Sequence, residues 1–387
     1  MFEPTYTAAL DRLQGFLPNA GRSYAEKRNY DDRANVSTLS PYIRHRIITE
    51  EDVLKATLQR HSATAAEKFI QEVYWRTYWK GWLELRPAVW DDYKATLQGS
   101  VNRVQTESGL RRDWEAACKG ETGIACFDHW AQELVETGYL HNHARMWFAS
   151  IWIFTLRLPW ALGADFFLRH LLDGDPASNT LSWRWVAGLQ TIGKTYLARH
   201  DNIAKYTKGR FHPEGLAIEA VPLEGRPHPP RGAVPQSDPI KGGGSSALLI
   251  TEEDLSPGWL LDRFAPEQTI VVQTTKSRSP WQVAPQVNDF VAGALNDCVA
   301  RYGAKLRRVS YVTPANVEDW CAQNNVRELV SSYIPVGPTR DALSHLPLSL
   351  QVRKYDADAW PHATHGFFRF KEKIPSLLGR LKGLELT

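Results

Sequence analysis

The sequence lacks the features that mark secreted, metal-binding and membrane-spanning proteins. Its 387 residues include only four cysteines, which form no CxxC pair and no metal-ligand spacing, so we expect free thiols in a reducing cytosol. No uninterrupted apolar run is long enough to span a bilayer. The first residues, Met1–Pro4, have neither the charged nor the apolar region of a signal peptide. These absences favour a cytoplasmic protein without a bound metal.

An excess of charge of one sign is also missing. Lysine and arginine total 46 against 43 acidic residues, a net charge of +3, and no lysine-rich tail or basic run indicates nucleic-acid binding. The total says nothing about a local basic groove, because it averages over the whole surface. What the sequence does have is 15 tryptophans, and this excess fits a buried aromatic ligand or an electron path.

The chain is longer than one typical domain, so we expect two. Over residues 1–211, apolar residues recur at helical spacing between turn residues, which predicts a mostly helical domain. Residues 212–246 are rich in proline and glycine and predict a linker. Over 247–387, short apolar runs alternate with helical stretches, which predicts a Rossmann-like α/β domain with a parallel sheet. The expected helices are Glu51–His61, Ala65–Leu85, Trp90–Thr96, Gly123–Thr137, Ala144–Leu156, Ala164–Leu172, Val287–Tyr302 and Asn316–Asn324, and the expected strands are Ala247–Thr251, Thr269–Gln273, Leu306–Val312, Glu328–Ser332 and Leu348–Lys354.

Two stretches, Thr137–Met146 and Asp173–Trp185, carry the strongest chemical signal. The second begins Asp-Gly-Asp-Pro, which predicts a turn into a capped helix. A buried helix with core tryptophans would explain that stretch on its own. In the first stretch, Asn142, Arg145 and Met146 lie at i, i+3 and i+4 and share one helix face. An amide, a cation and a thioether together suit a planar polar ligand better than a core.

Together the two stretches resemble the flavin domain of the DNA photolyase and cryptochrome family. That family carries T-G-W-x-H-N-x-x-R-M followed by D-G-D-x-A-x-N-x-x-x-W-x-W, and both patterns stand here in the same order, with Tyr139 in place of the first tryptophan. The resemblance implies an all-helical FAD-binding domain. The family's α/β domain normally precedes it, and Leu249–Leu255 and Gly366–Lys371 weakly resemble parts of that domain. We therefore expect a swapped domain order, as in a circular permutation, with an unrelated nucleotide fold as the alternative.

The resemblance also implies which residues hold FAD. Ser37–Tyr42 is similar to the family's phosphate loop, where hydroxyls and free amides at a helix N-terminus bind anions; the alternative is that Ser40 only caps a helix. Arg145 and Asp173 match an ion pair beside the flavin ring, and Asn179 matches the residue that faces flavin N5, where an asparagine is typical of the repair enzymes. For Arg76 the alternative is a solvated ion pair. The implied cofactor-binding residues are Tyr24, Ser37, Thr38, Leu39, Ser40, Arg76, Asn142, Arg145, Asp173, Asp175 and Asn179.

Tryptophans that match the family's photoreduction chain form a second set. Trp183 matches the flavin-proximal tryptophan and Trp160 the middle one, with core packing as the alternative for each. The third has no match, because Ser100–Arg112 contains no tryptophan. Trp90 and Trp114 are the candidates to replace it, and the alternative is that the chain of tryptophans ends before a third member.

A third set matches the substrate pocket of cyclobutane-dimer photolyases, which flip damaged pyrimidines out of the duplex. Its tryptophans would stack on bases and its polar side chains would bind base edges. We therefore expect light-driven repair of pyrimidine dimers in DNA by reduced FAD, with Trp183, Trp160, Asn179 and Glu72 as catalytic residues. A blue-light sensor or another flavoprotein without repair activity is the alternative, and an antenna chromophore and a signalling partner stay open. The pocket residues are Glu72, Trp75, Asn142, Met146 and Trp185.

Overall fold

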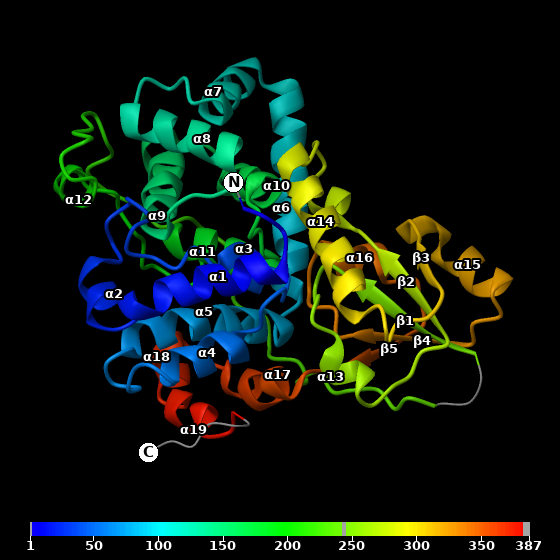
Figure 1. The fold of residues 1–387 in the computed structure, drawn as a ribbon. Helices are drawn as coiled ribbons and strands as arrows, with labels where there is room; N and C mark the ends of the chain where they lie inside the picture. Colours follow the sequence, from blue (N-terminus) through cyan, green and yellow to red (C-terminus); the bar gives the residue numbers. More distant parts are fainter. Residues whose placement is uncertain (1, 242–244, 382–387) are drawn as a thin grey trace.

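In the computed structural model, residues 2–241 and 245–381 are described. Gly242–Gly244 of the predicted linker and residues 382–387 of the predicted second domain lie outside them. The first half of the chain is helical, as predicted, and Figure 1 shows it beside a separate sheet. No helix among the described residues is both long enough and apolar enough to cross a bilayer. The helices of this half are α1 (Tyr6–Phe16), α2 (Arg22–Lys27), α3 (Ser40–Arg44), α4 (Glu50–Leu58), α5 (Glu67–Glu84), α6 (Ala88–Thr106), α7 (Ser108–Lys119), α8 (Ala125–Thr137), α9 (Asn142–Ser150), α10 (Trp160–His170), α11 (Pro176–Val186) and α12 (His200–Tyr206).

The second half contains a five-stranded parallel sheet in the order β3-β2-β1-β4-β5. The predicted Rossmann-like class is therefore confirmed. The chain adds β2 and β3 on one side of β1 and then β4 and β5 on the other, so the strand order switches between β1 and β4. Open α/β sheets hold ligands in the crevice at the carboxyl ends of such a pair. The elements are β1 (Ser246–Thr251), α13 (Gly258–Leu261), β2 (Gln268–Val272), α14 (Pro285–Tyr302), β3 (Val309–Tyr311), α15 (Val317–Gln323), β4 (Glu328–Ser332), α16 (Pro338–Leu343) and β5 (Leu348–Gln351).

The last helices, α17 (Lys354–Ala359), α18 (Phe367–Lys371) and α19 (Ile374–Leu378), follow the sheet in sequence, yet α17 and α18 pack on α5. The hydroxyls of Tyr355 and Thr77 lie 2.8 Å apart. A Cβ on Gly81 would come within 2.7 Å of the Trp360 ring, so only glycine allows this approach. The predicted second domain thus contributes helices to the core of the first, although they are distant in sequence.

The predicted linker has no regular secondary structure among its described residues before Ser246, where β1 begins, and it runs along both halves. The Gly232 amide donates to the Leu85 carbonyl at 2.8 Å, and the Asp238 amide donates to the Leu350 carbonyl of β5 at 2.9 Å. These contacts tie the linker to the end of α5 at one point and to the edge of the sheet at another.

Candidate functional site

A buried ion pair joins α5 to the start of α11. Arg76 Nη1 lies 3.2 Å from Asp175 Oδ2, and Arg76 Nε lies 3.2 Å from Glu50 Oε1. Asp175 also caps α11, because its Oδ1 accepts from the Ser178 amide at 2.8 Å, as the Asp-Gly-Asp-Pro pattern predicts. Burial alone would raise the pKa of Asp175, but nearby cations, Arg76 foremost, outweigh it and hold that pKa well below its ordinary value. Arg76 is therefore part of a buried cluster and not of a solvated pair.

A second ion pair joins α9 to the same loop. Arg145 Nη2 lies 2.8 Å from Asp173 Oδ2, and Arg145 Nε donates to the Leu140 carbonyl at 2.8 Å. Asp173 Oδ1 is buried and has no partner among the described residues. Because α11 contacts both α5 and α9, the predicted cationic and acidic residues converge around one loop, Leu171–Asp175.

Asn179 and Trp183 follow on successive turns of α11. Asn179 Nδ2 donates to the Ala164 carbonyl at 2.8 Å, which fixes the amide and leaves its oxygen as an acceptor. Trp183 is buried, and its indole Nε1 has no partner in the described part of the chain. Its ring meets Trp152 edge-on at 6.2 Å. No motif in the sequence singled out Trp152, so this neighbour was missed.

Gly163 of α10 lies directly against Trp183, where a Cβ would come within 2.3 Å of the ring. We expect Gly163→Ala to destabilise the protein by about 1–3 kcal/mol through overpacking. Gly99 of α6 is the matched control, since a Cβ there meets nothing within 4 Å; Gly99→Ala should stabilise the protein by up to about 1 kcal/mol. Thermal unfolding of both variants checks this, and equal midpoints would show that Trp183 moves freely.

The structure distinguishes between Trp90 and Trp114, the two candidates for the third tryptophan of the photoreduction chain. Trp160 packs on Tyr93 with ring centroids 5.8 Å apart, and Tyr93 packs on Trp90 at 5.1 Å. Trp114 instead stacks on Trp281 at 4.9 Å. An aromatic series therefore continues from Trp160 through Tyr93 to Trp90.

The predicted phosphate loop lies beside a cation that sequence reasoning missed. Arg12 Nη1 of α1 donates to Thr38 Oγ1 at 2.6 Å, and Thr38 takes a left-handed φ of 50°. Ser40 is the first residue of α3 and makes no side-chain cap bond, so the capping alternative is wrong. Tyr24 is buried against Phe69 of α5 at 5.3 Å between ring centroids.

The five predicted pocket residues differ from the buried cluster in their exposure. Glu72 retains 37% of its side-chain exposure, Asn142 is exposed, and the others are half-buried. Trp75 has one face covered by Phe367 of α18, with ring centroids 3.6 Å apart and planes 11° from parallel. This stack joins residues almost 300 positions apart in sequence, and no local pattern predicts it. Trp185 stacks on Tyr196 at 5.7 Å.

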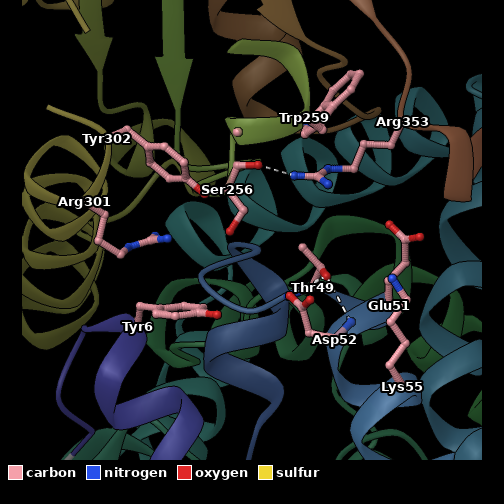
Figure 2. Close-up of a pocket in the computed structure, with 11 residues that line it drawn as sticks. Tyr6, Thr49, Glu51, Asp52, Lys55, Ser256, Trp259, Arg301, Tyr302 and Arg353 are labelled. Carbon is pink, nitrogen blue, oxygen red and sulfur yellow. Dashed lines mark hydrogen bonds between the residues drawn. The ribbon is translucent and has the colours of Figure 1, made fainter. Parts of the chain in front are cut away.

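A separate cavity of about 500 Å³ lies between the helical half and the α/β half (Figure 2). Thr49 and Asp52 of the helical half face Ser256, Trp259 and Arg353 across it. None of the predicted site residues lines this cavity. Its Arg353 is already paired, in bidentate fashion, with Asp254 at 2.6 and 2.8 Å.

Comparisons with known proteins agree on the helical half. Residues 69–220 match the family model described as the FAD binding domain of DNA photolyase. The chain is 26% identical over 215 residues to a deoxyribodipyrimidine photo-lyase of Vibrio cholerae, covering 53% of this chain and 43% of that protein. It is 32% identical over 227 residues to an enzyme of that name from Thermus thermophilus, covering 55% and 51%. A crystal structure of a bacterial class III photolyase from Agrobacterium tumefaciens aligns with a TM-score of 0.46 at 28% identity, covering 53% and 43%. The chain thus spans about half the length of the curated relatives it matches.

FAD is the cofactor of the matched domain, and the residues present fit it. Arg12 lies beside Thr38 of the loop predicted to bind the diphosphate. Arg76 lies beside Asp175, and Arg145 lies beside Asp173. Asp173 Oδ1 is a buried carboxylate oxygen without a protein partner among the described residues, as expected beside a polar ligand. Arg76, Arg145, Asp173, Asp175 and Asn179 are the residues that would hold it.

Proposed function

The helical half of this chain belongs to the DNA photolyase and cryptochrome family, and from that premise we propose that the protein repairs cyclobutane pyrimidine dimers in DNA with light. One observation carries the proposal. Side chains suited to binding bases lie on α5, α9 and α11, next to the ion pairs around the Leu171–Asp175 loop, and they are exposed or half-buried and not fully buried. The α/β half would then follow the flavin domain, in a permuted order.

In this proposal the chain's own residues bind and orient the flipped bases. The free face of Trp75 and the ring of Trp185 stack on them, and Glu72 and Asn142 bind their edges. When bound, reduced FAD would supply the electron that splits the dimer and would take it back once the two pyrimidines have separated. The Arg145–Asp173 and Arg76–Asp175 pairs, whose carboxylates are buried, fix the charges around the cofactor.

The test is illumination of the purified, reduced protein with dimer-containing DNA, scored by the loss of dimers over time. Samples kept in the dark and samples with oxidised flavin are the controls. Light-dependent loss of dimers supports the lyase. Intact dimers with a fully reduced, lit protein would leave the lyase proposal without support.

A cryptochrome-like blue-light sensor is the second candidate, and one observation favours it. Phe367 already takes one face of Trp75, and this reduces the stacking surface left for a base. A sensor would bind FAD and change shape or partner in blue light without altering DNA. Light-dependent protease sensitivity together with unaltered dimers would favour the sensor over the lyase.

We expect Trp183→Phe to slow the light-driven reduction of oxidised flavin at least tenfold while FAD stays bound. Phenylalanine preserves the packing against Gly163 and Trp152 but is far harder to oxidise than tryptophan. Absorbance spectra during steady illumination measure the rate. An unchanged rate would mean that electrons enter by another route.

Tyr93→Phe tests the aromatic series beyond Trp160. Tyr93 is fully buried between Trp160 and Trp90, so loss of its hydroxyl leaves the packing intact and removes an oxidisable ring. We expect photoreduction to become slower, with Trp114→Phe as the control that leaves it unchanged. Equal photoreduction rates in wild type and in Tyr93→Phe would show that the electron path does not extend beyond Trp160 to Tyr93.

A further inference from the structure

The loop that carries both flavin-site acids is held by a side chain from α3. Gly174 lies between Asp173 and Asp175, and its carbonyl accepts a hydrogen bond from Arg44 Nε at 2.9 Å. The same nitrogen lies 3.9 Å from Asp175 Oδ2. Because Arg44 is only 2% exposed, water does not compete for this contact. Fixing the Gly174 carbonyl fixes the directions in which the two flanking acids leave the backbone.

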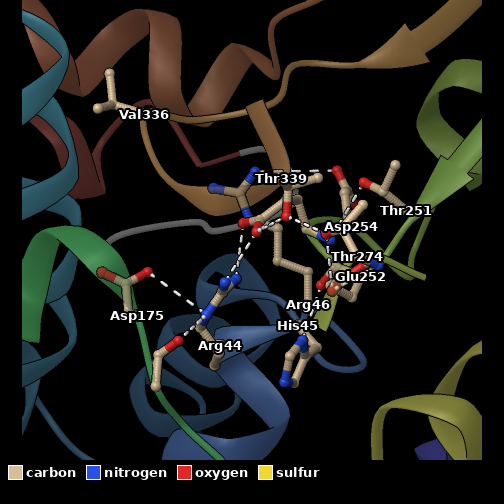
Figure 3. A network of polar contacts seen from close by, with 12 residues as sticks. Arg44, His45, Arg46, Asp175, Thr251, Glu252, Asp254, Thr274, Val336 and Thr339 are labelled. Atoms are coloured by element: carbon tan, nitrogen blue, oxygen red, sulfur yellow. Dashed lines mark hydrogen bonds and ion pairs between the residues drawn. The ribbon is translucent and has the colours of Figure 1, made fainter. Parts of the chain in front are cut away.

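The other end of Arg44 is held by the α/β half. Its Nη1 and Nη2 bind Glu253 Oε2 and Oε1 at 2.7 and 2.9 Å, a bidentate pair. Glu253 follows β1, and its Oε1 also accepts from Thr339 Oγ1 of α16 at 2.9 Å. Figure 3 shows Arg44 reaching from the helical half between Asp175 on one side and Thr339 on the other. All three guanidinium nitrogens are thus engaged.

Arg44 meets the sheet where open α/β folds usually bind a ligand. Glu253 lies just past the end of β1 and Thr339 lies beyond β4, so the guanidinium occupies the carboxyl side of the switch between these two strands. Open α/β sheets bind their ligands at this position. Here a side chain of the helical half takes the place of a ligand and connects the sheet to the flavin loop.

Energetics favour a role in positioning over one in stability. A buried ion pair carries a desolvation cost that often cancels its Coulombic gain, and apolar replacements of similar size are frequently as stable. A bidentate guanidinium does, however, fix geometry, because its planar fork permits few orientations.

We propose that Arg44 and Glu253 are positioning residues through which the α/β half sets the FAD affinity of the helical half. Glu253 orients the fork of Arg44, Arg44 Nε holds the Gly174 carbonyl, and the loop presents Asp173 and Asp175 to the cofactor. The inference rests on FAD binding and is independent of DNA repair. A protein that binds FAD without repairing dimers leaves it intact.

The test compares two double variants that each remove one buried ion pair of the segment that follows β1. Arg44→Met/Glu253→Met removes the pair that contacts the flavin loop. Arg353→Met/Asp254→Met removes the neighbouring pair, which joins the same β1-following segment to residue 353 and makes no contact with Gly174. Fluorescence titration of the apoprotein with FAD gives Kd, and thermal unfolding of the apoprotein reports stability separately. We expect the first variant to raise Kd about tenfold or more, the factor for one lost charge-assisted hydrogen bond, and the control to leave Kd nearly unchanged.

Two results would overturn the proposal. An equal rise in Kd for both double variants would show that FAD binding responds to the loss of any buried pair in the segment after β1, and an unchanged Kd in both would show that the loop needs no support. If the first double variant does not fold, Arg44→Lys replaces it, because lysine keeps the charge beside Glu253 and loses the fixed fork that also reaches Gly174. Arg353→Lys is then the control. An equal rise in Kd for the two lysine variants, or an unchanged Kd in both, would again overturn the proposal.

Discussion

Asp175→Ala is expected to abolish FAD binding and to lower the thermal unfolding midpoint by on the order of 10 °C. Removing one partner of a buried pair costs about 3–5 kcal/mol, because the other charge stays buried without compensation. Here Arg76 and Arg44 each lose one acidic partner, at 3.2 and 3.9 Å, but keep Glu50 and Glu253, so we expect the lower end of this range. Loss of the helix cap on Ser178 adds about 1 kcal/mol. Flavin absorbance per chain and a thermal scan measure both effects.

The pH dependence of this effect follows from the sign of the pKa shift. The folded pKa of Asp175 lies below its ordinary value, so the carboxylate's contribution to stability is complete above the unfolded pKa, about 3.9, and is lost as the pH falls through the folded value. The difference between wild type and Asp175→Ala should therefore be constant from about pH 5 to 8. The control is Asp201→Ala, whose carboxylate is 70% exposed in a surface pair with Arg199 and should change stability by less than about 1 kcal/mol. A stable, yellow Asp175→Ala protein would refute the assignment.

Local patterns predicted much of this fold because their causes are local. The Asp-Gly-Asp-Pro sequence predicted a capped helix, and Asp175 caps α11. Alternating apolar runs predicted strands, and β4 spans the expected residues Glu328–Ser332. The helix α7, Ser108–Lys119, was missed although its apolar residues Leu110, Trp114 and Cys118 recur at helical spacing.

The contacts that join distant segments could not be predicted in the same way. Arg44 and Glu253 are 209 residues apart, and neither stands in a periodic or motif context that indicates a partner. Phe367 lies in a short aromatic segment whose helix could have packed on the sheet, yet it stacks on Trp75 of α5. Such pairs depend on how the two halves dock. The roles of the site residues therefore remain predictions, although the structure brings several of them together.

Trp75→Ala and Glu72→Ala are each expected to impair dimer repair while leaving FAD bound. Both side chains lie on the face of α5 that also carries Arg76; Glu72 is 37% exposed against 14% for Arg76, and Trp75 is half-buried. Loss of a stacking ring costs roughly 1–3 kcal/mol per base, which lowers the affinity for dimer-containing DNA about tenfold to a hundredfold. Loss of Glu72 leaves a base edge unpaired in a desolvated pocket, at a similar cost of roughly 1–3 kcal/mol. Binding and repair of a dimer-containing oligonucleotide, with flavin content measured in parallel, give the result.

Two controls separate stacking from a general loss of structure. Trp75→Phe keeps an aromatic face against Phe367 and should recover most of the repair lost in Trp75→Ala. Trp114→Ala removes an equally large ring from a stack on Trp281, far from α5 in sequence, and should leave DNA affinity unchanged. If wild type repairs dimers and Trp75→Ala and Glu72→Ala repair them equally fast, the bases do not bind at this face of α5. If Trp114→Ala is as impaired as Trp75→Ala, the loss reflects weakened packing and not a missing stacking surface.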